Sequence, residues 1–263
     1  MKGIIGAIAG DIIGSSREFR PIKRKKFSLF NDYSIFTDDT VMTLAIASWL
    51  IKDKTSTKTL VSEIKSFGLK YPDAGYGGMF INWLFQENPN PYGSWANGSA
   101  MRVSPVAWVA DSLSETQRLA EMSANVTHNH PEGVKGALAT ADAIYLARIG
   151  SSKDEIKQHI EYSYGYDLDR KIDDIRPNYK FDVSCSGSVP ESIICFLEAS
   201  DFEDTIRNAV SLGGDADTQA AIAGSIASAY WEVPAKISAK SLYILDENLL
   251  EVFIKFMDMY GGK

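Results

Sequence analysis

The sequence is poor in cysteine, with two such residues, Cys185 and Cys195, in a chain of 263. Their spacing fits neither a disulfide framework nor a thiolate zinc site. We therefore expect two reduced thiols in a reducing, cytoplasmic compartment. Zinc bound by a cysteine cluster is excluded.

Long apolar runs and an excess of positive charge are also missing. The N-terminal apolar stretch, residues 3–10, is interrupted by Asp11, is too short to span a membrane and leads to no cleavage-like site. The formal net charge of -7 disfavours a nucleic-acid-binding surface, which is normally basic. We expect no membrane association and no nucleic-acid partner, and we interpret the one basic run, residues 20–26, as a solvated loop.

The chain does have an ordinary globular composition, with 45% hydrophobic and 23% charged residues. Apolar residues recur at helical spacing in several segments, and almost none show the period-two alternation of exposed strands. No linker-like tract and no repeat of solenoid length divides the chain. The sequence therefore predicts an all-α protein in which residues 1–263 form one domain, and we expect a monomer.

Several helix ends can be placed from capping residues. Ser114 with Gln117, and Ser152 with Glu155, fit capping boxes, in which a hydroxyl and a carboxyl or amide side chain satisfy amides of the first turn. Gly150 suits the C-terminal cap of the preceding helix. These residues predict helices that begin near positions 114 and 152 and a helix that ends near position 150.

The C-terminal half carries further helix signals. Pro190 suits the first position of a helix that continues over residues 191–199, and residues 201–212 form an amphipathic stretch that two glycines end. Residues 218–231 have almost no bulky side chains, which predicts a central helix packed closely against its neighbours. The polar stretch 165–182 predicts a long surface loop.

Three glycines share one face of the first predicted helix, because Gly6, Gly10 and Gly14 recur every four residues. Each glycine costs a helix about 1 kcal/mol relative to alanine, so packing must outweigh the loss. The pattern predicts a close contact between this helix and another element.

Two acidic clusters stand at the starts of predicted helices. Residues 37–40, TDDT, precede the apolar run 41–51, and residues 215–218, DADT, follow a pair of glycines. A single cluster of this kind is typical of an N-cap with carboxylates placed favourably for the helix dipole. Two such clusters favour a shared site, because the glycines give the backbone freedom to converge on something small.

Four carboxylates in one site would repel each other and protonate in part unless a cation were bound. Carboxylate and hydroxyl oxygens favour magnesium or manganese over zinc or copper, and six ligands suffice for two ions with water completing each shell. We therefore expect two Mg²⁺ ions, with Mn²⁺ as the alternative.

Two further segments carry weaker signals. Residues 93–102 form a small-residue loop that leads into a helix, and its backbone amides could hold a diphosphate, although most such loops bind nothing. His128 and His130 are separated by one residue, but no third soft ligand accompanies them. Hydrogen bonding to substrate or helix capping is therefore favoured over zinc binding.

Taken together, these segments resemble the ADP-ribosylglycohydrolase family over nearly the whole chain. The resemblance rests on residues 10–14 with Glu18, and on residues 37–40, 93–102, 127–131 and 213–218. It implies an orthogonal all-α fold and a binuclear magnesium or manganese site. It also implies hydrolysis of the bond between C1 of the distal ribose of ADP-ribose and a modified acceptor, so the expected partners are ADP-ribose and ADP-ribosylated protein.

Roles are carried over from the resemblance residue by residue. The implied metal ligands are Thr37, Asp38, Asp39, Asp215, Asp217 and Thr218. The implied substrate contacts are Gly93, Ser94, Trp95, Asn97, Gly98, Ser99 and His128. The candidates for proton transfer are Glu18, Asp38, Asp39 and Asp215, of which Glu18 matches a family glutamate that gates the site or positions water. No motif identifies the aromatic ring that stacks on adenine, for which Phe181 and Tyr179 are candidates.

The acceptor is expected to be arginine on a protein, because residues 128–133 are similar to the arginine-directed branch of the family. Residues 93–102 are similar to both the arginine- and the serine-directed branches, so ADP-ribosylserine and small ADP-ribose conjugates are alternatives. A catalytically idle protein that binds ADP-ribose is a third. An aspartate-based phosphatase is disfavoured, because its aspartates normally follow a buried strand of a parallel sheet.

Overall fold

The computed structural model describes residues 1–261, which form fifteen α-helices and, within that range, no β-strand. The first eight helices are α1 (Ile5–Ser15), α2 (Asp38–Asp53), α3 (Thr57–Lys70), α4 (Gly78–Leu84), α5 (Gly98–Met101), α6 (Ser104–Val109), α7 (Leu113–Asn125) and α8 (Pro131–Arg148). The others are α9 (Lys153–Tyr164), α10 (Ile172–Ile175), α11 (Cys185–Leu197), α12 (Phe202–Leu212), α13 (Ala216–Tyr230), α14 (Ala235–Ile244) and α15 (Glu247–Tyr260). The all-α prediction is confirmed.

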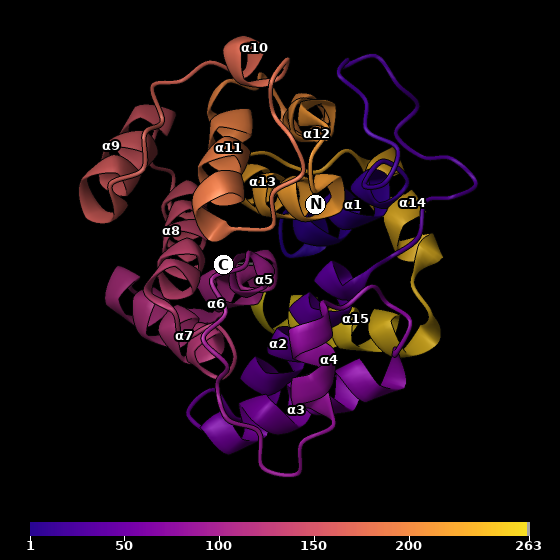
Figure 1. Ribbon diagram of the computed structural model, residues 1–263, viewed down its shortest axis with the longest axis vertical. Coiled ribbons are helices and arrows are strands. Elements are labelled where there is room, and N and C mark those ends of the chain that lie inside the picture. Colours follow the sequence, from indigo (N-terminus) through magenta and orange to yellow (C-terminus); the bar gives the residue numbers. More distant parts are fainter. Residues whose placement is uncertain (262–263) are drawn as a thin grey trace.

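Helices α1 and α13 lie side by side at the centre of the fold (Figure 1). Every residue of α13 from Ala216 to Ala229 is buried, which confirms a central helix there. A Cβ atom on Gly10 of α1 would lie only 2.0 Å from the carbonyl oxygen of Ala220 on α13. Glycine is therefore required at this contact, as the spacing of the three glycines predicts.

The remaining helices surround this central pair. Helices α8, α11 and α12 pack against α13, while α2 contacts α1 and also α3, α6 and α15. The buried apolar side chains form one continuous cluster that includes residues of nearly every long helix. The core thus places the N-termini of α2 and α13 on the same side of the central packing, where the acidic clusters lie.

Two of the predicted helix starts are wrong. The N-cap of α7 is Ser112, not Ser114, because the Ser112 hydroxyl accepts a hydrogen bond from the Glu115 amide at 3.1 Å. Helix α11 begins at Cys185, with Ser184 as its N-cap, and Pro190 lies inside it rather than at its first position. The small and polar residues before Pro190 thus continue the helix upstream, and the proline is tolerated within it.

Other predicted boundaries are confirmed. Ser152 and Glu155 form a capping box at the start of α9. Gly150, with φ +90°, follows the end of α8, and Gly213, with φ +67°, ends α12 in the left-handed conformation that glycine accommodates. Within residues 165–182 the predicted loop contains the short helix α10 and three buried apolar side chains, Tyr166, Leu168 and Ile172.

The basic run is more structured than a solvated loop. The Lys23 ammonium group donates to the carbonyl oxygens of Tyr179 and Leu212, and Lys25 forms an ion pair with Asp204. The segment that follows α1 thereby contacts both ends of α12, at Asp204 and at Leu212.

Across residues 1–261, no helix is both long enough and apolar enough to cross a bilayer. The prediction of one domain over residues 1–263 extends to residues 262 and 263, which lie outside the described part of the chain, and it stays a prediction, as does the monomeric state.

Candidate functional site

A cavity of about 420 Å³ lies where the starts of α2 and α13 meet the loops before α4, α5 and α11. Its wall includes five carboxylates, from Glu18, Asp38, Asp39, Asp215 and Asp217, together with backbone and side chains of four other segments. The volume is within the range of ordinary small-molecule sites. Both predicted acidic clusters therefore face one cavity.

The first cluster caps α2. Thr37 is the N-cap residue, and its hydroxyl oxygen accepts a hydrogen bond from the Asp39 amide at 3.4 Å. Asp38 and Asp39 follow in the first turn, where the positive end of the helix dipole favours negative charge. The Asp38 amide donates to the carbonyl oxygen of Ala74 at 2.8 Å, which fixes the helix start against the loop before α4.

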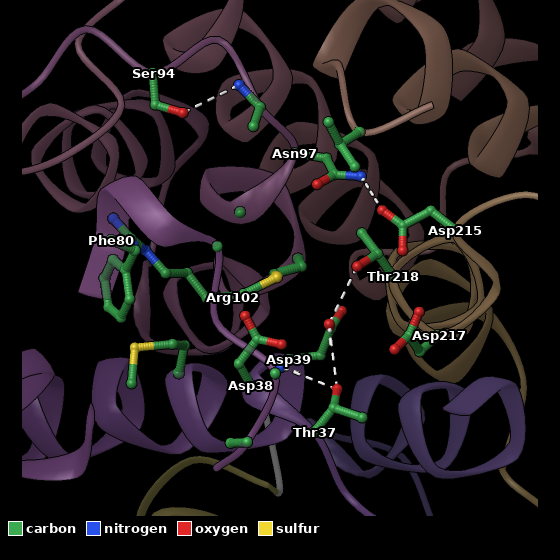
Figure 2. A pocket seen from close by; sticks show the side chains of 18 of the residues that line it. Thr37, Asp38, Asp39, Phe80, Ser94, Asn97, Arg102, Asp215, Asp217 and Thr218 are labelled. Atoms are coloured by element: carbon green, nitrogen blue, oxygen red, sulfur yellow. Dashed lines mark hydrogen bonds between the residues drawn. The ribbon is translucent and has the colours of Figure 1, made fainter. Parts of the chain in front are cut away.

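The second cluster begins α13 and lies beside the first cluster in the cavity wall (Figure 2). The left-handed turn at Gly213 ends α12 and redirects the chain at once into α13. A Cβ atom on Gly214 would lie 2.4 Å from the ring of Tyr179, so only glycine fits at that position. This tight connection projects Asp215, Asp217 and Thr218 into the cavity.

Direct hydrogen bonds connect the cavity walls. The Thr218 hydroxyl donates to Oδ2 of Asp39 at 3.1 Å, which joins two positions 179 residues apart. The Asn97 amide nitrogen donates to Oδ2 of Asp215 at 2.7 Å (Figure 2). The walls are thus held in a defined relative position by side chains that belong to the predicted site.

Asp11 is a carboxylate of this region that the sequence analysis did not assign to the site. It lies on α1, is fully buried and accepts hydrogen bonds from the amides of Thr37 and Thr40 at 2.9 and 3.0 Å. Both threonine hydroxyls also donate to it. The available signal was a lone carboxylate within an otherwise apolar helix. Asp11 therefore orients the start of α2, including the Thr37 hydroxyl that faces the cavity.

Burial and mutual repulsion make these carboxyl groups hard to ionise. Burial and the Asp11 and Asp215 charges raise the pKa of Asp38 to about 8, and burial and Asp215 raise that of Glu18 to about 7. The pKa values of Asp39 and Asp217 lie well above the usual range for the same two reasons. Without a counter-charge, this cavity thus favours protonated carboxyl groups.

The arrangement of the carboxylates fits a hard divalent cation. Oxygen atoms of Asp11, Asp39 and Asp217 lie within 4.8 Å of one another, and so do those of Glu18, Asp215 and Asp217. Asp217 belongs to both groups. Oδ1 of Asp39 and Oδ1 of Asp217 are buried and have no hydrogen-bond partner within residues 1–261. Uncompensated buried oxygens of this kind are costly, and a cation would satisfy them.

Residues with hydrogen-bond donors also line the cavity. Of the residues expected to contact the substrate, Ser94, Asn97, Gly98 and His128 line the cavity, whereas Gly93, Trp95 and Ser99 do not. The Ser99 hydroxyl donates to the Gly133 carbonyl, and the amide of Gly93 donates to Asn129.

The free donors lie at the tip of this loop. Among residues 1–261 no acceptor engages the backbone amides of Ser94 and Trp95, whereas the amides of Ala96 and Asn97 are already bonded to Ser94 and Val183. Both amides belong to the loop 93–102, whose backbone the sequence predicts to hold a diphosphate.

Aromatic and basic groups complete the cavity. Phe181, one of the two candidates for adenine stacking, lines it and is 51% exposed, whereas Tyr179 is not a lining residue and donates its hydroxyl to the Gly187 carbonyl. Tyr92, Phe80 and the buried Arg102 also line the wall and were not anticipated. Their residue types alone, on core-like segments, gave no signal that distinguishes them from ordinary buried side chains.

Comparison with known proteins gives consistent results. A model of the family described as ADP-ribosylglycohydrolase matches residues 1–257. The ADP-ribosylhydrolase ARH3 of Homo sapiens is 28% identical over 305 residues, covering 87% of this chain and 84% of the relative. The ADP-ribosylarginine hydrolase Tri1 of Pseudomonas putida is 25% identical over 261 residues, covering 88% and 70%.

A similar fold occurs among solved structures. A chain of an ADP-ribosylglycohydrolase-related protein complex superposes with a TM-score of 0.74 at 22% identity, covering 97% of this chain and 95% of that one. The overall fold is thus shared with a protein of widely different sequence.

Proposed function

The chain belongs to the ADP-ribosylglycohydrolase family, and from this membership we propose that it is a metal-dependent hydrolase that releases ADP-ribose from ADP-ribosylated arginine on proteins. One observation carries the proposal: one cavity is lined by five converging carboxylates and, in other segments of its wall, by residues with hydrogen-bond donors such as Ser94 and His128. Such a division suits a ligand with ribose hydroxyls beside bound cations and a diphosphate beside neutral donors.

Thr37, Asp38, Asp39, Asp215, Asp217 and Thr218 would hold two Mg²⁺ or Mn²⁺ ions. Support comes from the two overlapping carboxylate groups that share Asp217 and from the orphaned oxygens of Asp39 and Asp217. The Thr37 and Thr218 hydroxyls direct their hydrogens toward Asp11 and Asp39, which leaves oxygen lone pairs available. When bound, the ions would lower the pKa of a water molecule and orient the ribose hydroxyls.

Glu18 is the proposed proton carrier. Its side chain lies next to Asp215 and Asp217, and in the metal-free cavity partial burial and the Asp215 charge raise its pKa to about 7. Because Glu18 is not one of the proposed metal ligands, its carboxyl group stays available for general acid or base catalysis. Asp38, Asp39 and Asp215 are the alternatives, but as metal ligands they would have reduced basicity.

Arginine is proposed as the acceptor because its guanidinium group would leave as a cation or a hydrogen-bonded neutral base beside an acidic wall. Asp38 is only partly buried and faces the loop at Gly75, so a carboxylate lies where the acceptor would exit. The similarity to the ADP-ribosylarginine hydrolase Tri1 supports this choice. ADP-ribosylserine, small ADP-ribose conjugates and an idle ADP-ribose-binding protein are the alternatives that the same cavity would accommodate.

The test is release of free ADP-ribose from arginine-, serine- and small-molecule-linked ADP-ribose, with Mg²⁺ and with chelator. We expect release from the arginine conjugate with Mg²⁺ and none with chelator. Asp258→Asn, an exposed carboxylate on α15, serves as a matched control for Asp217→Asn. Release from the serine conjugate alone would show that serine, not arginine, is the acceptor. ADP-ribose binding without release from any conjugate would show that the protein is a catalytically idle ADP-ribose-binding protein.

The role of Glu18 is tested separately with Glu18→Gln, which keeps the size and polarity of the side chain but cannot carry the proton. We expect kcat to fall roughly 100-fold while KM changes little, because general acid or base catalysis contributes on the order of 10² to 10⁴. An unchanged kcat would assign the proton transfer to another carboxylate.

A further inference from the structure

His128 lines the same cavity as the carboxylates and is 5% exposed. Its backbone amide is held by the Ala124 carbonyl at 2.7 Å, and its ring packs against Tyr92 with centroids 5.9 Å apart. Nε2 faces Gly98, where a Cβ atom would lie 2.9 Å away. Glycine at this position therefore leaves the Nε2 edge of the imidazole open to the cavity.

Nδ1 of the same ring is not free. It lies 2.7 Å from the hydroxyl oxygen of Thr127, which is itself completely buried. Either group could donate in this contact, so the position of the proton depends on what else the hydroxyl contacts. That third group is Arg102, whose Nη2 donates to the Thr127 hydroxyl oxygen at 2.8 Å and to the Ser123 carbonyl.

The arginine decides the direction of the threonine hydrogen bond. A guanidinium group has donors and no acceptor, so the Thr127 hydroxyl must accept from Arg102 and cannot donate to it. Within residues 1–261 no other acceptor contacts this hydroxyl, and leaving its hydrogen unpaired would cost about 1–3 kcal/mol. The hydroxyl hydrogen therefore points to Nδ1 of His128, which must be an unprotonated acceptor.

We propose that Arg102 and Thr127 are positioning residues that hold His128 in the neutral tautomer with its proton on Nε2, so that the ring presents a hydrogen-bond donor to the cavity. In the imidazolium form Nδ1–H would donate to the Thr127 hydroxyl, and the hydrogen of that hydroxyl would be left without an acceptor. Burial and the nearby Arg102 charge oppose that form too, since they hold the pKa of His128 well below its usual value. The ionisable groups that face the ring are Arg102 and Tyr92.

This assignment makes His128 a hydrogen-bond donor to the substrate in the proposed reaction. A neutral donor with a fixed tautomer can hydrogen-bond a ligand oxygen over the whole neutral pH range without acting as a base. Its orientation is supplied before the ligand arrives, because both partners behind the ring are buried. Pre-organised donors of this kind lose little entropy on binding.

The test begins with the ligand-free protein, labelled with ¹⁵N in its three histidines. Long-range ¹H–¹⁵N correlation distinguishes the two tautomers and the imidazolium, and the His128→Asn variant assigns the signals. We expect protonated Nε2 and unprotonated Nδ1 from pH 6 to pH 8. A ring protonated on Nδ1, or on both nitrogens, would overturn the proposal.

Variants of Thr127 test what holds the tautomer. Thr127→Ser keeps the hydroxyl and should preserve both ¹⁵N shifts, whereas Thr127→Val keeps the shape and should move the Nδ1 shift and expose a second tautomer. Thr116→Val is the matched control, because Thr116 is equally buried and donates to the Ser112 carbonyl far from His128. Unchanged His128 shifts in Thr127→Val, or altered shifts in Thr127→Ser, would contradict the assignment.

A kinetic measurement completes the test and rests on the proposed hydrolase activity. Thr127→Val should raise KM for an ADP-ribosylated substrate roughly five- to tenfold with a smaller change in kcat, and Thr127→Ser should restore it. An unchanged KM in Thr127→Val would remove the ligand contact from the proposal. The NMR measurement needs no substrate. A protein without hydrolase activity could therefore still show the predicted His128 tautomer, so failure of the proposed function is distinguishable from failure of the tautomer assignment.

Discussion

Removing divalent cations should make this protein lose stability as the pH rises from 5 to 8. The metal-free cavity binds protons tightly, with the pKa of Asp11 raised to about 6, that of Glu18 to about 7 and that of Asp38 to about 8. The same groups in the unfolded chain have pKa values near 4. Between these limits the folded state holds more protons than the unfolded state, so stability that is fully present below about pH 4 is lost as the pH rises through the folded pKa values.

The magnitude can be worked from Asp38. Each pH unit over which the folded state holds one extra proton lowers the free energy of unfolding by about 1.4 kcal/mol. A proton held from pH 5 to pH 8 therefore accounts for a loss of about 4 kcal/mol. Asp38 is partly exposed, and solvent screening reduces this figure to about 2 kcal/mol. For a chain of this size, about 2 kcal/mol corresponds to a fall in Tm of roughly 4–8 °C. Mg²⁺ replaces the protons, so the increase in Tm that it causes should grow with pH.

The assay is thermal unfolding in chelator and in excess Mg²⁺ at several pH values between 5 and 8. Asp38→Asn should flatten the metal-free profile, and the exposed Asp258→Asn should leave it unchanged. A metal-free Tm that is constant or rises over this range would refute the reasoning. So would an increase in Tm with Mg²⁺ that is the same at every pH, because bound cations and protons would then not compete for the same oxygens.

Three further substitutions test other parts of the structure. Asp217→Ala should lower turnover by at least about 100-fold while circular dichroism remains native, because it removes the carboxylate common to both candidate ion groups; retained activity would contradict that placement. His128→Ala should lower kcat/KM more than His130→Ala, since His130 only caps α8 by accepting from the Glu132 amide at 3.2 Å, and the reverse order would mean that the wrong imidazole had been chosen. Gly10→Ala should destabilise the protein by about 3 kcal/mol in urea unfolding, because its Cβ would overlap the backbone of α13. Gly78→Ala, where a Cβ meets nothing within 4 Å, is the control for Gly10→Ala, and equal effects would rule out the close contact.

Much of the helical framework could be predicted because local capping chemistry specifies it. Ser152 with Glu155 and the glycine after α12 satisfy unpaired backbone groups with neighbouring residues, so sequence alone suffices. The error at α7 arose where two serines two residues apart both had suitable partners, and Ser112 was selected by its actual hydrogen bond. Pro190 was misplaced because proline favours the first turn of a helix, whereas here it lies in the helix interior, where the surrounding packing must offset the backbone hydrogen bond that it removes.

The acidic wall of the cavity was predictable from two clusters, whereas the groups behind it were not. Asp11 reaches the site because α1 lies against α13 and carries it beside the start of α2, a relation that depends on tertiary packing. Arg102 and Thr127 act on His128 through the fold, since Arg102 follows α5 and the other two follow α7. Their effect depends on which group donates and which accepts each hydrogen bond, and the spacing of residues in the sequence does not reveal this.

The contact between α1 and α13 also bears on how far this protein can vary. Where side chains separate two helices, a change of residue alters the distance between the helix axes. Here the backbones of Gly10 and Ala220 are in direct contact, so no side chain sets the distance between α1 and α13 and the two helices cannot come closer. Asp11 and Asp217 sit on these two backbones. Outer helices could therefore be extensively redesigned while the two carboxylates keep their mutual spacing. For the same reason, a residue larger than glycine on this face of α1 would not fit against α13.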